Sequence, residues 1–227
     1  VIEPGLYSNI QDYGRFGYRN IGVPYSGFMD QDSARTANKI VGNDENESLI
    51  EITLMGPTLL FNADYILSIT GADFSSLINN DKVDMYKPIH VKLGDTLKIN
   101  HSKYGARCYL AISGGIDIKS ILGSKSSFKG LTSSYFLKKG DEIKIINNNK
   151  PNFSFDCKSV FKIDIVLHVS KGPEFCMLKK DSLDMLFNKK FTIGVNNRMG
   201  YNFIEKLRVG LKSIISSPVL PGTIQLT

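Results

Sequence analysis

The sequence has no tryptophan, only three cysteines and three histidines in 227 residues, and no long hydrophobic run. Its apolar stretches, such as Ile163–Leu167, are strand-sized, far below the roughly 20 residues of a membrane-spanning helix. The N-terminus lacks the basic and apolar regions of a secretory signal. Cys108, Cys157 and Cys176 form no close pair, so we expect no disulfide framework and a cytoplasmic location.

Motifs for metal binding and for hydrolytic nucleophiles are also missing. His90, His101 and His168 lie far apart, and there is no Cys-x-x-Cys, so the sequence predicts no metal site. The Gly-x-Ser-x-Gly elbow of serine hydrolases is absent. Gly123–Ser127, which reads Gly-Ser-Lys-Ser-Ser, resembles a phosphate loop but lacks the Walker spacing, and we interpret it as a turn.

The charge is moderately positive, with 28 Lys and Arg against 22 Asp and Glu and a pI near 9.1. The lysines are scattered and form no stripe, which does not favour nucleic-acid binding. Arginine is scarce, and in a chain that prefers lysine we expect an arginine where a planar, bidentate guanidinium is needed for binding. A surface ion pair with Asp or Glu is the alternative interpretation of each arginine. Four of the six arginines lie in Gly- or Asn-rich turns: Arg15, Arg19, Arg107 and Arg198.

The spacing of apolar and turn residues predicts a mainly β chain with a few short helices. The first 27 residues are punctuated by Gly and Pro, which indicates short extended pieces joined by turns. A helix is predicted over 31–41, with Asp30 as N-cap and Gly42–Asn43 as the stop. Short β-branched runs then predict strands at Ile50–Thr53, Tyr65–Thr70, Ser75–Ile78, Ile89–Lys92, Thr96–Asn100, Cys108–Ser113 and Glu142–Ile146.

Two turn patterns add detail to this strand-rich region. Asn79–Asp81 is a plausible hairpin tip, and the segments 93–99 and 139–145 share a Gly-Asp turn that leads into an alternating strand. Strands this short and numerous indicate a barrel or a sandwich.

A linker is predicted at Asn147–Asn152, which divides the chain into domains 1–149 and 150–227. The second half suggests a short helix at Ser182–Phe187. Its expected strands are Val160–Val169, Ile193–Val195, Ile214–Ser216 and Thr223–Leu226. Because the sequence stops inside a strand-like run, which would leave an unpaired edge, we expect the second domain to be truncated at its C-terminus.

Three polar clusters have side chains suited to a small anion or amide. The first, Gln11–Tyr18 with Ser26–Asp30, places an amide, a carboxylate, a guanidinium and a hydroxyl before a helix N-terminus, which favours anions. The second joins Gly71–Asp73 to Gly105–Arg107 and Ser113–Gly115, and the third is Asn197–Gly200. A plain turn or ion pair is the alternative interpretation for each residue.

Ordered motifs along essentially the whole chain carry a family resemblance. They include Gln11–Tyr18, Gly22–Asp30, Thr70–Asp73, Arg107–Ala111, Leu122–Ser124, Gly172–Pro173, Arg198–Gly200 and Gly222–Gln225. By these motifs the sequence resembles the allophanate hydrolase subunit 2 family, also called the biotin-dependent carboxyltransferase or KipI antagonist (KipA) family. It departs from the family at Asn196–Asn197, where Ser-Asp is usual.

The resemblance implies two cyclophilin-like β-barrel domains and a role as one of the three subunits (PxpC) of an ATP-dependent 5-oxoprolinase. With a KipI-like subunit and a LamB/YcsF-like subunit, such a complex opens 5-oxo-L-proline to L-glutamate, using ATP with Mg²⁺. Two alternatives remain: a non-catalytic protein that binds a KipI-like partner, and a carboxyltransferase that uses biotin and acts on urea or a similar amide.

An unstrained lactam resists water, so its carbonyl oxygen must be activated, and the protein contributes positioning and charge neutralisation. Under the resemblance, Arg107 or Arg15 binds the substrate carboxylate, while Asp12 or Asp73 handles a proton or the metal held by ATP. The expected catalytic residues are thus Asp12, Asp73 and Arg107. The expected substrate-binding residues are Gln11, Arg15, Tyr18, Ser26, Asn38 and Arg198, with Gln11 and Asn38 holding amide groups. This hypothesis requires the arginines to converge with the first helix's amino end in an anion pocket between the two domains.

Overall fold

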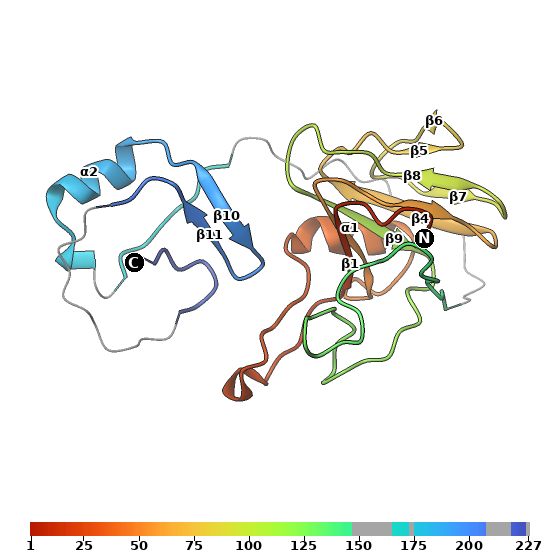
Figure 1. Cartoon of the computed structure of the whole chain (residues 1–227), viewed down its shortest axis with the longest axis horizontal. Coiled ribbons are helices and arrows are strands. Elements are labelled where there is room, and N and C mark those ends of the chain that lie inside the picture. Colours follow the sequence, from red (N-terminus) through yellow and green to blue (C-terminus); the bar gives the residue numbers. More distant parts are fainter. Residues whose placement is uncertain (147–164, 173–174, 208–218, 226–227) are drawn as a thin grey trace. The chain divides into compact units, whose positions relative to one another are not determined.

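The computed structural model describes residues 1–146, 165–172, 175–207 and 219–225 (Figure 1). The chain forms two compact units, Val1–Asp164 (unit 1) and Ile165–Thr227 (unit 2). The predicted linker Asn147–Asn152 and the boundary after residue 149 lie outside the described residues. No helix in the described ranges is long and apolar enough to cross a membrane.

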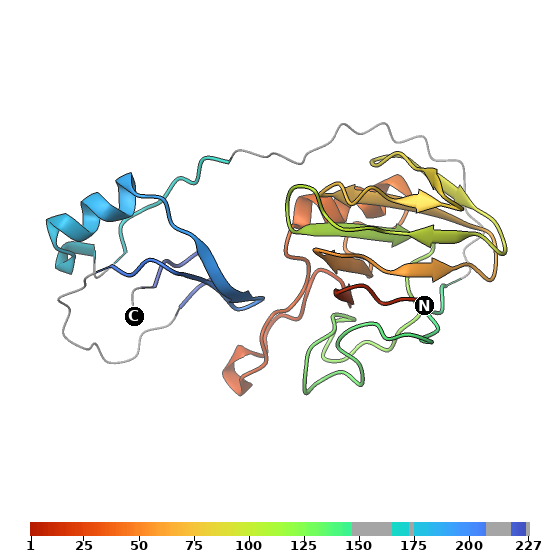
Figure 2. The ribbon, with the colours of Figure 1, turned by 45° about the horizontal axis from the view of Figure 1, so that its top comes forward.

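Within its described residues, 1–146, unit 1 has two antiparallel sheets and one α-helix, α1 (Gln31–Ile40), and Figure 2 shows how the strands lie. A short 3-10 helix, η1 (Arg19–Ile21), precedes α1. The five-stranded sheet has the order β1 (Tyr7–Gln11), β2 (Leu49–Thr53), β9 (Arg107–Ile112), β4 (Tyr65–Gly71), β7 (Ile89–Val91). The four-stranded sheet has the order β3 (Thr58–Leu60), β8 (Thr96–Lys98), β5 (Leu77–Ile78), β6 (Asp81–Lys82).

The five-stranded sheet is covered on both faces, because side chains alternate along each strand. One face sends Ile50 and Leu110 into the main core, where they meet Leu97 of the four-stranded sheet. On the opposite face, Tyr109 and Ala111 point toward α1 and belong to a second, smaller hydrophobic cluster. The mainly β class is therefore confirmed, while closure into a cyclophilin-like barrel stays a prediction.

Helix α1 begins where the sequence predicts. The Asp30 carboxylate accepts the backbone N–H of Ser33 (3.1 Å) and its hydroxyl (2.5 Å), as an N-cap does. The helix ends at Ile40, one residue earlier than predicted, because Gly42 takes a left-handed φ of 72°.

The two Gly-Asp turns have the same geometry, but the segments that follow them differ in secondary structure. Gly94 and Gly140 have φ of 90° and 85°, and each following aspartate accepts the backbone N–H three residues earlier at 2.7 Å. Only the first turn leads into a strand, β8. The predicted strand Glu142–Ile146 is wrong, because this segment pairs only through an isolated bridge between Ile145 and Ile116.

The other predicted strands of unit 1 are present, with shifted ends. The prediction for Ser75–Ile78 holds only for Leu77–Ile78, because Ser75 turns the chain with φ of 49°. The hairpin tip is confirmed at Asn79 and Asn80, which both have positive φ. The strands β1, β3 and β6 were not predicted.

Unit 2 contains η2 (Phe175–Met177), α2 (Lys180–Asn188), β10 (Ile193–Asn197) and β11 (Gly200–Phe203). The predicted helix and the strand at Ile193–Val195 are confirmed, and both extend further than expected, whereas β11 was not predicted. The strand Val160–Val169 is wrong over its described part, 165–169, and Thr223–Leu226 is wrong over 223–225. Ile214–Ser216 lies outside the described residues.

Candidate functional site

A row of polar side chains crosses the five-stranded sheet on the face that carries α1. The strand register places Asn9 opposite Glu51, Glu51 opposite Tyr109, and Tyr109 opposite Thr70. The first three side chains are at least 99% buried. Polar groups in such a place are normally hydrogen-bonded, so the partners of each one show what the row does.

Glu51 and Tyr109 hold the start of α1 onto the sheet. Glu51 Oε2 accepts the backbone N–H of Met29 (2.9 Å), and the Tyr109 hydroxyl accepts the N–H of Asp30 (2.7 Å). Burial, with the charge of Glu51 acting in the same direction, raises the pKa of Tyr109 well above its usual value. The phenol therefore keeps its proton at neutral pH and is able to donate it in a hydrogen bond.

Arg107 lies two residues before Tyr109 on β9, so its side chain is on the same face of the sheet and extends the row. Its Nε lies 3.6 Å from Glu51 Oε1, and its side chain is 14% exposed. The carboxylate of Glu51 thus lies between a guanidinium and the amino end of α1, both of which favour negative charge. Arg107 thus approaches the carboxylate that accepts the N–H of Met29, just before α1.

Asn9 differs from every other member of the row. Its side chain is 1% exposed, yet neither its carboxamide oxygen nor its nitrogen has a hydrogen-bond partner among the described residues. An unmatched buried polar group costs about 1–3 kcal/mol, so such a group indicates a missing partner. A carboxamide offers a donor and an acceptor side by side, which matches an amide or a carboxyl group.

Asp12 is enclosed by hydrogen bonds from the 124–126 loop. Its carboxylate accepts the hydroxyls of Ser124 (2.6 Å) and Ser126 (2.5 Å) and the backbone N–H groups of Gly14 (2.9 Å) and Lys125 (2.6 Å). Through these four hydrogen bonds, Asp12 acts as a clamp that holds its own loop against the 124–126 loop.

Arg15 is fully buried against the same loop. Its Nε donates to the carbonyl of Ile121 (2.9 Å), and its Nη2 donates to that of Ser126 (2.8 Å) and, at 3.4 Å, to that of Ser124. Desolvation by burial lowers the pKa of Arg15, while the charge of Asp12 opposes this shift. Arg15 and Arg107 therefore occupy different surroundings, and no described contact joins them.

Gln11, Ser26 and Tyr18 belong to the same loop region. Gln11 Oε1 accepts the N–H of Gly27 (3.0 Å), and its Nε2 donates to the carbonyl of Ser127 (3.2 Å). The Ser26 hydroxyl is buried without a partner among the described residues. Tyr18 is half-buried and lies directly before η1.

The remaining predicted residues lie apart from the polar row. Asn38 is fully buried in the second half of α1 and donates to the carbonyl of Glu47 (2.7 Å), so it shapes the loop that follows the helix. Asp73 is exposed and accepts the N–H of Ser75 (2.7 Å). Arg198 lies in unit 2, in the turn between β10 and β11.

The Lys125 ammonium pairs with Glu47 Oε1 at 2.7 Å, which ties the 123–127 turn to the loop that follows α1. No three His, Cys, Asp or Glu side chains gather as a metal site in the part of the chain that the structure describes. Full burial raises the pKa of Cys108, which makes its thiol a poor nucleophile.

Asn9, Glu51 and Tyr109 were not predicted as site residues. A signal existed for Glu51, which stands between Ile50 and Ile52 in a predicted strand and thus shares the face opposite to those apolar residues. Asn9 had none, because β1 itself was not predicted.

Comparison with known proteins places the chain in a family. The profile of the carboxyltransferase domain, subdomain A and B, matches residues 21–227. Urea amidolyase of Saccharomyces cerevisiae is 36% identical over 90% of this chain, which spans only 12% of that enzyme. The C subunit of Escherichia coli 5-oxoprolinase is 30% identical over the whole chain, which covers 75% of that protein.

A solved structure agrees with the sequence matches. The crystal structure of TTHA0988 superposes on the whole chain with a TM-score of 0.85 at 27% identity, and the chain covers 45% of it. A profile match over more than 200 residues and a 30% identical relative that is three-quarters covered lead to one conclusion. The chain belongs to the carboxyltransferase domain family, subdomain A and B.

Proposed function

We propose that this chain acts as the PxpC-type subunit of an ATP-dependent 5-oxoprolinase complex, which hydrolyses 5-oxo-L-proline to L-glutamate. The observation that carries the proposal is the buried polar row with its unmatched carboxamide, Asn9. A lactam presents its N–H and its carbonyl on one edge, which is complementary to the donor and acceptor of a carboxamide. Similarity over the whole chain to the C subunit of a 5-oxoprolinase supports the same function.

Three residues of the row each bind a different group of the substrate. Asn9 pairs with the lactam edge, and Arg107 neutralises the substrate carboxylate with a guanidinium that Glu51 orients. The protonated Tyr109 hydroxyl donates toward charge that develops on the lactam oxygen. Of the residues predicted from the sequence, Arg107 keeps its proposed catalytic role, while Asp12 and Arg15 keep the loops in place around the row.

The 123–127 turn gives ATP and its Mg²⁺ little support in this chain. The hydroxyls of Ser124 and Ser126 are bound to Asp12, and Lys125 is paired with Glu47. We therefore assign ATP to the KipI-like or the LamB/YcsF-like subunit of the proposed cytoplasmic complex. This chain's own contribution is to hold and orient the lactam.

A coupled assay with the purified KipI-like and LamB/YcsF-like subunits tests this function. Glutamate release from 5-oxoproline should require ATP and this chain together. Arg107→Lys, which keeps the charge but loses the planar fork, should raise KM about tenfold or more, whereas Lys119→Arg on a remote loop should leave KM unchanged. Absence of glutamate release from the complete mixture would contradict the proposal.

The second candidate is a biotin-dependent carboxyltransferase, which the family profile and the urea amidolyase match favour. Activity would then require bicarbonate and a biotin-bearing protein, and urea or a similar amide would be carboxylated. A third outcome, tight binding of the KipI-like subunit without glutamate release or carboxylation, would identify a non-catalytic KipI antagonist.

A further inference from the structure

The segment 13–25, here called the aromatic arm, leaves unit 1 between β1 and α1. In both ribbon views the arm projects from the sheets, with η1 at its tip (Figures 1 and 2). Its two sides are joined at the base, where the N–H of Arg15 donates to the carbonyl of Tyr25 (2.7 Å). The clamp made by Asp12 and the buried Arg15 then fixes this base to the 121–126 loop.

Along the arm, three aromatic rings stack between two guanidinium groups. The ring centroids of Tyr13 and Phe16 are 5.0 Å apart, and those of Phe16 and Tyr25 are 4.9 Å apart. Arg35 of α1 lies 5.0 Å from the Tyr13 ring, and Arg19 lies 4.6 Å from the Tyr25 ring. The stack holds these side chains in one arrangement before any partner arrives, which lowers the entropy cost of binding.

The stack remains accessible. Tyr13 is 38% exposed, Phe16 is 48% exposed, and Ile21 at the tip is 64% exposed. Exposed apolar residues are ordinary one by one, but a contiguous group on a projecting segment marks an interaction site. Tyrosine, phenylalanine and arginine are also the residues enriched in the buried centres of protein interfaces.

The charge of the arm selects its partner. No Asp or Glu occurs between residues 13 and 29, while Arg19 is exposed. The Arg19 guanidinium makes no hydrogen bond or ion pair with the described residues, so its N–H groups are available for a carboxylate.

From these observations we propose that the aromatic arm docks a protein partner that presents carboxylates beside apolar side chains. The inference rests on the proposed function, under which that partner is the KipI-like subunit. In the docked state Arg19 pairs with a carboxylate of the partner, and the edges of Phe16 and Tyr13 pack against its apolar side chains. Ile21 adds apolar area at the rim.

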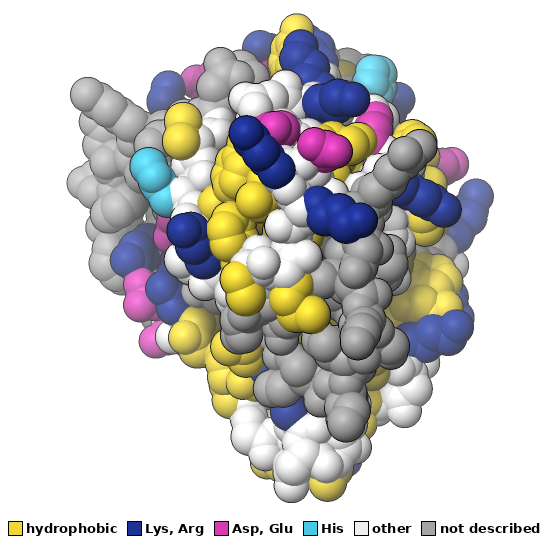
Figure 3. Space-filling model, turned by 90° about the vertical axis from the view of Figure 1, so that its left-hand side faces the viewer, with side chains coloured by type: hydrophobic (Ala, Val, Ile, Leu, Met, Phe, Trp, Pro, Cys, Tyr) yellow, Lys and Arg dark blue, Asp and Glu magenta, His cyan; other side chains and the backbone are white. Residues whose placement is uncertain are grey.

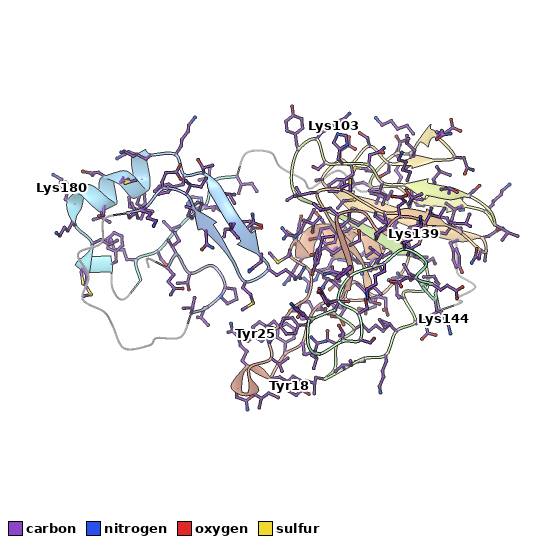
Figure 4. All side chains as sticks on the ribbon, in the orientation of Figure 1. Tyr18, Tyr25, Lys103, Lys139, Lys144 and Lys180 are labelled. Atoms are coloured by element: carbon purple, nitrogen blue, oxygen red, sulfur yellow. The ribbon has the colours of Figure 1, made fainter. Side chains whose placement is uncertain are left out.

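Binding measurements with the purified KipI-like subunit test the arm. The double variant Arg19→Glu/Phe16→Ala should weaken affinity at least tenfold, since exposed aromatic and arginine anchors dominate such interfaces. The matched control is Lys103→Glu/Tyr104→Ala, which likewise reverses one positive charge and removes one aromatic ring, on a loop where Tyr104 is 68% exposed. Figure 4 shows Lys103 at the opposite side of unit 1 from Tyr18 and Tyr25. The control should lose less than twofold.

Hydrogen exchange of the wild-type chain gives a second readout that needs no variant. Amides of 13–25 should become protected when the KipI-like partner is bound. Protection confined to other segments, or equal affinities for the two double variants, would overturn the arm but leave the proposed function standing. Absence of both a complex and glutamate release would reject the proposed function together with the arm. Self-association that only the arm variant abolishes, or arm-dependent binding of an oligonucleotide in place of the KipI-like partner, would also overturn the proposed partner.

Discussion

Unit 1 and unit 2 both combine a helix with antiparallel strands, but they differ in what they bury. Among the described residues, unit 1 has a core of 27 buried hydrophobic side chains, whereas the buried residue of unit 2 is Ser182. Val195 and Phe203 of the β10–β11 hairpin are 81% and 50% exposed. Figure 3 shows hydrophobic side chains open to solvent between lysines and arginines. A two-stranded hairpin has little stability alone.

The two units also differ in charge. Residues 1–164 carry 19 Lys and Arg against 18 Asp and Glu, and residues 165–227 carry nine against four. Nearly all of the positive balance therefore belongs to the smaller unit. The low net charge and the buried core of unit 1 are typical of a unit that is stable by itself. The exposed apolar and cationic side chains of unit 2 are typical of a binding surface.

The largest expected difference is in core mutations. Leu110→Ala, in the fully buried centre of the five-stranded sheet, should lower the free energy of unfolding by about 2–5 kcal/mol. Val195→Ala in the exposed hairpin should change it by less than about 0.5 kcal/mol. Urea denaturation followed by circular dichroism measures both. A large loss for Val195→Ala would break the comparison between the units.

A smaller effect separates two buried asparagines of unit 1. Asn9→Leu removes an unmatched carboxamide and should stabilise the chain by about 1–2 kcal/mol, because the cost of an unpaired buried polar group disappears. Asn38→Leu should destabilise it by about 1–3 kcal/mol, since the carbonyl of Glu47 loses its donor. Thermal unfolding of the two variants decides the sign. Destabilisation by Asn9→Leu would show that Asn9 is a matched structural residue.

The smallest effect concerns acid pH and applies to both units. The N–H of Lys92 and the amide of Asn79 lower the pKa of Asp95, and the N–H and hydroxyl of Thr192 lower that of Glu205. A lowered folded-state pKa gives stability that is present above the unfolded pKa and is lost as pH falls through the folded one.

Unfolding curves between pH 6 and pH 2 should therefore show a shallower acid loss for Asp95→Asn and for Glu205→Gln than for wild type. Lys98→Gln, which changes the net charge by one unit without touching either carboxylate, is the control. Curves that run parallel to the wild type would contradict the assignment of these two carboxylates.

The sequence predicted those parts of the fold that are determined locally. Asp30 caps α1, and Gly94 with Asp95 turns the chain into β8, because each motif satisfies its own backbone groups. The segment 142–146 has the same turn before it but pairs only at Ile145, since strand formation needs a neighbour and not only a suitable turn.

The site was less predictable, because it is built from register. Arg107 was recognised from its place after a Gly-rich turn, yet Glu51 lies beside it, and Asn9 beside Glu51, only through the pairing of β1, β2 and β9. Arg15 was recognised only as a candidate for the substrate carboxylate, and the sequence did not indicate that its guanidinium holds the carbonyls of a loop more than 100 residues away in sequence. Such long-range closure leaves no local signal.

Steady-state glutamate release by Asn9→Leu, in the complex with the KipI-like and LamB/YcsF-like subunits, tests the central claim most directly. If the unmatched carboxamide of the row holds the lactam, the variant should fold, be more stable than wild type and assemble, yet lose at least tenfold in kcat/KM for 5-oxoproline. Wild-type kcat/KM in a stabilised, fully assembled Asn9→Leu variant would contradict the assignment of the polar row as the substrate site.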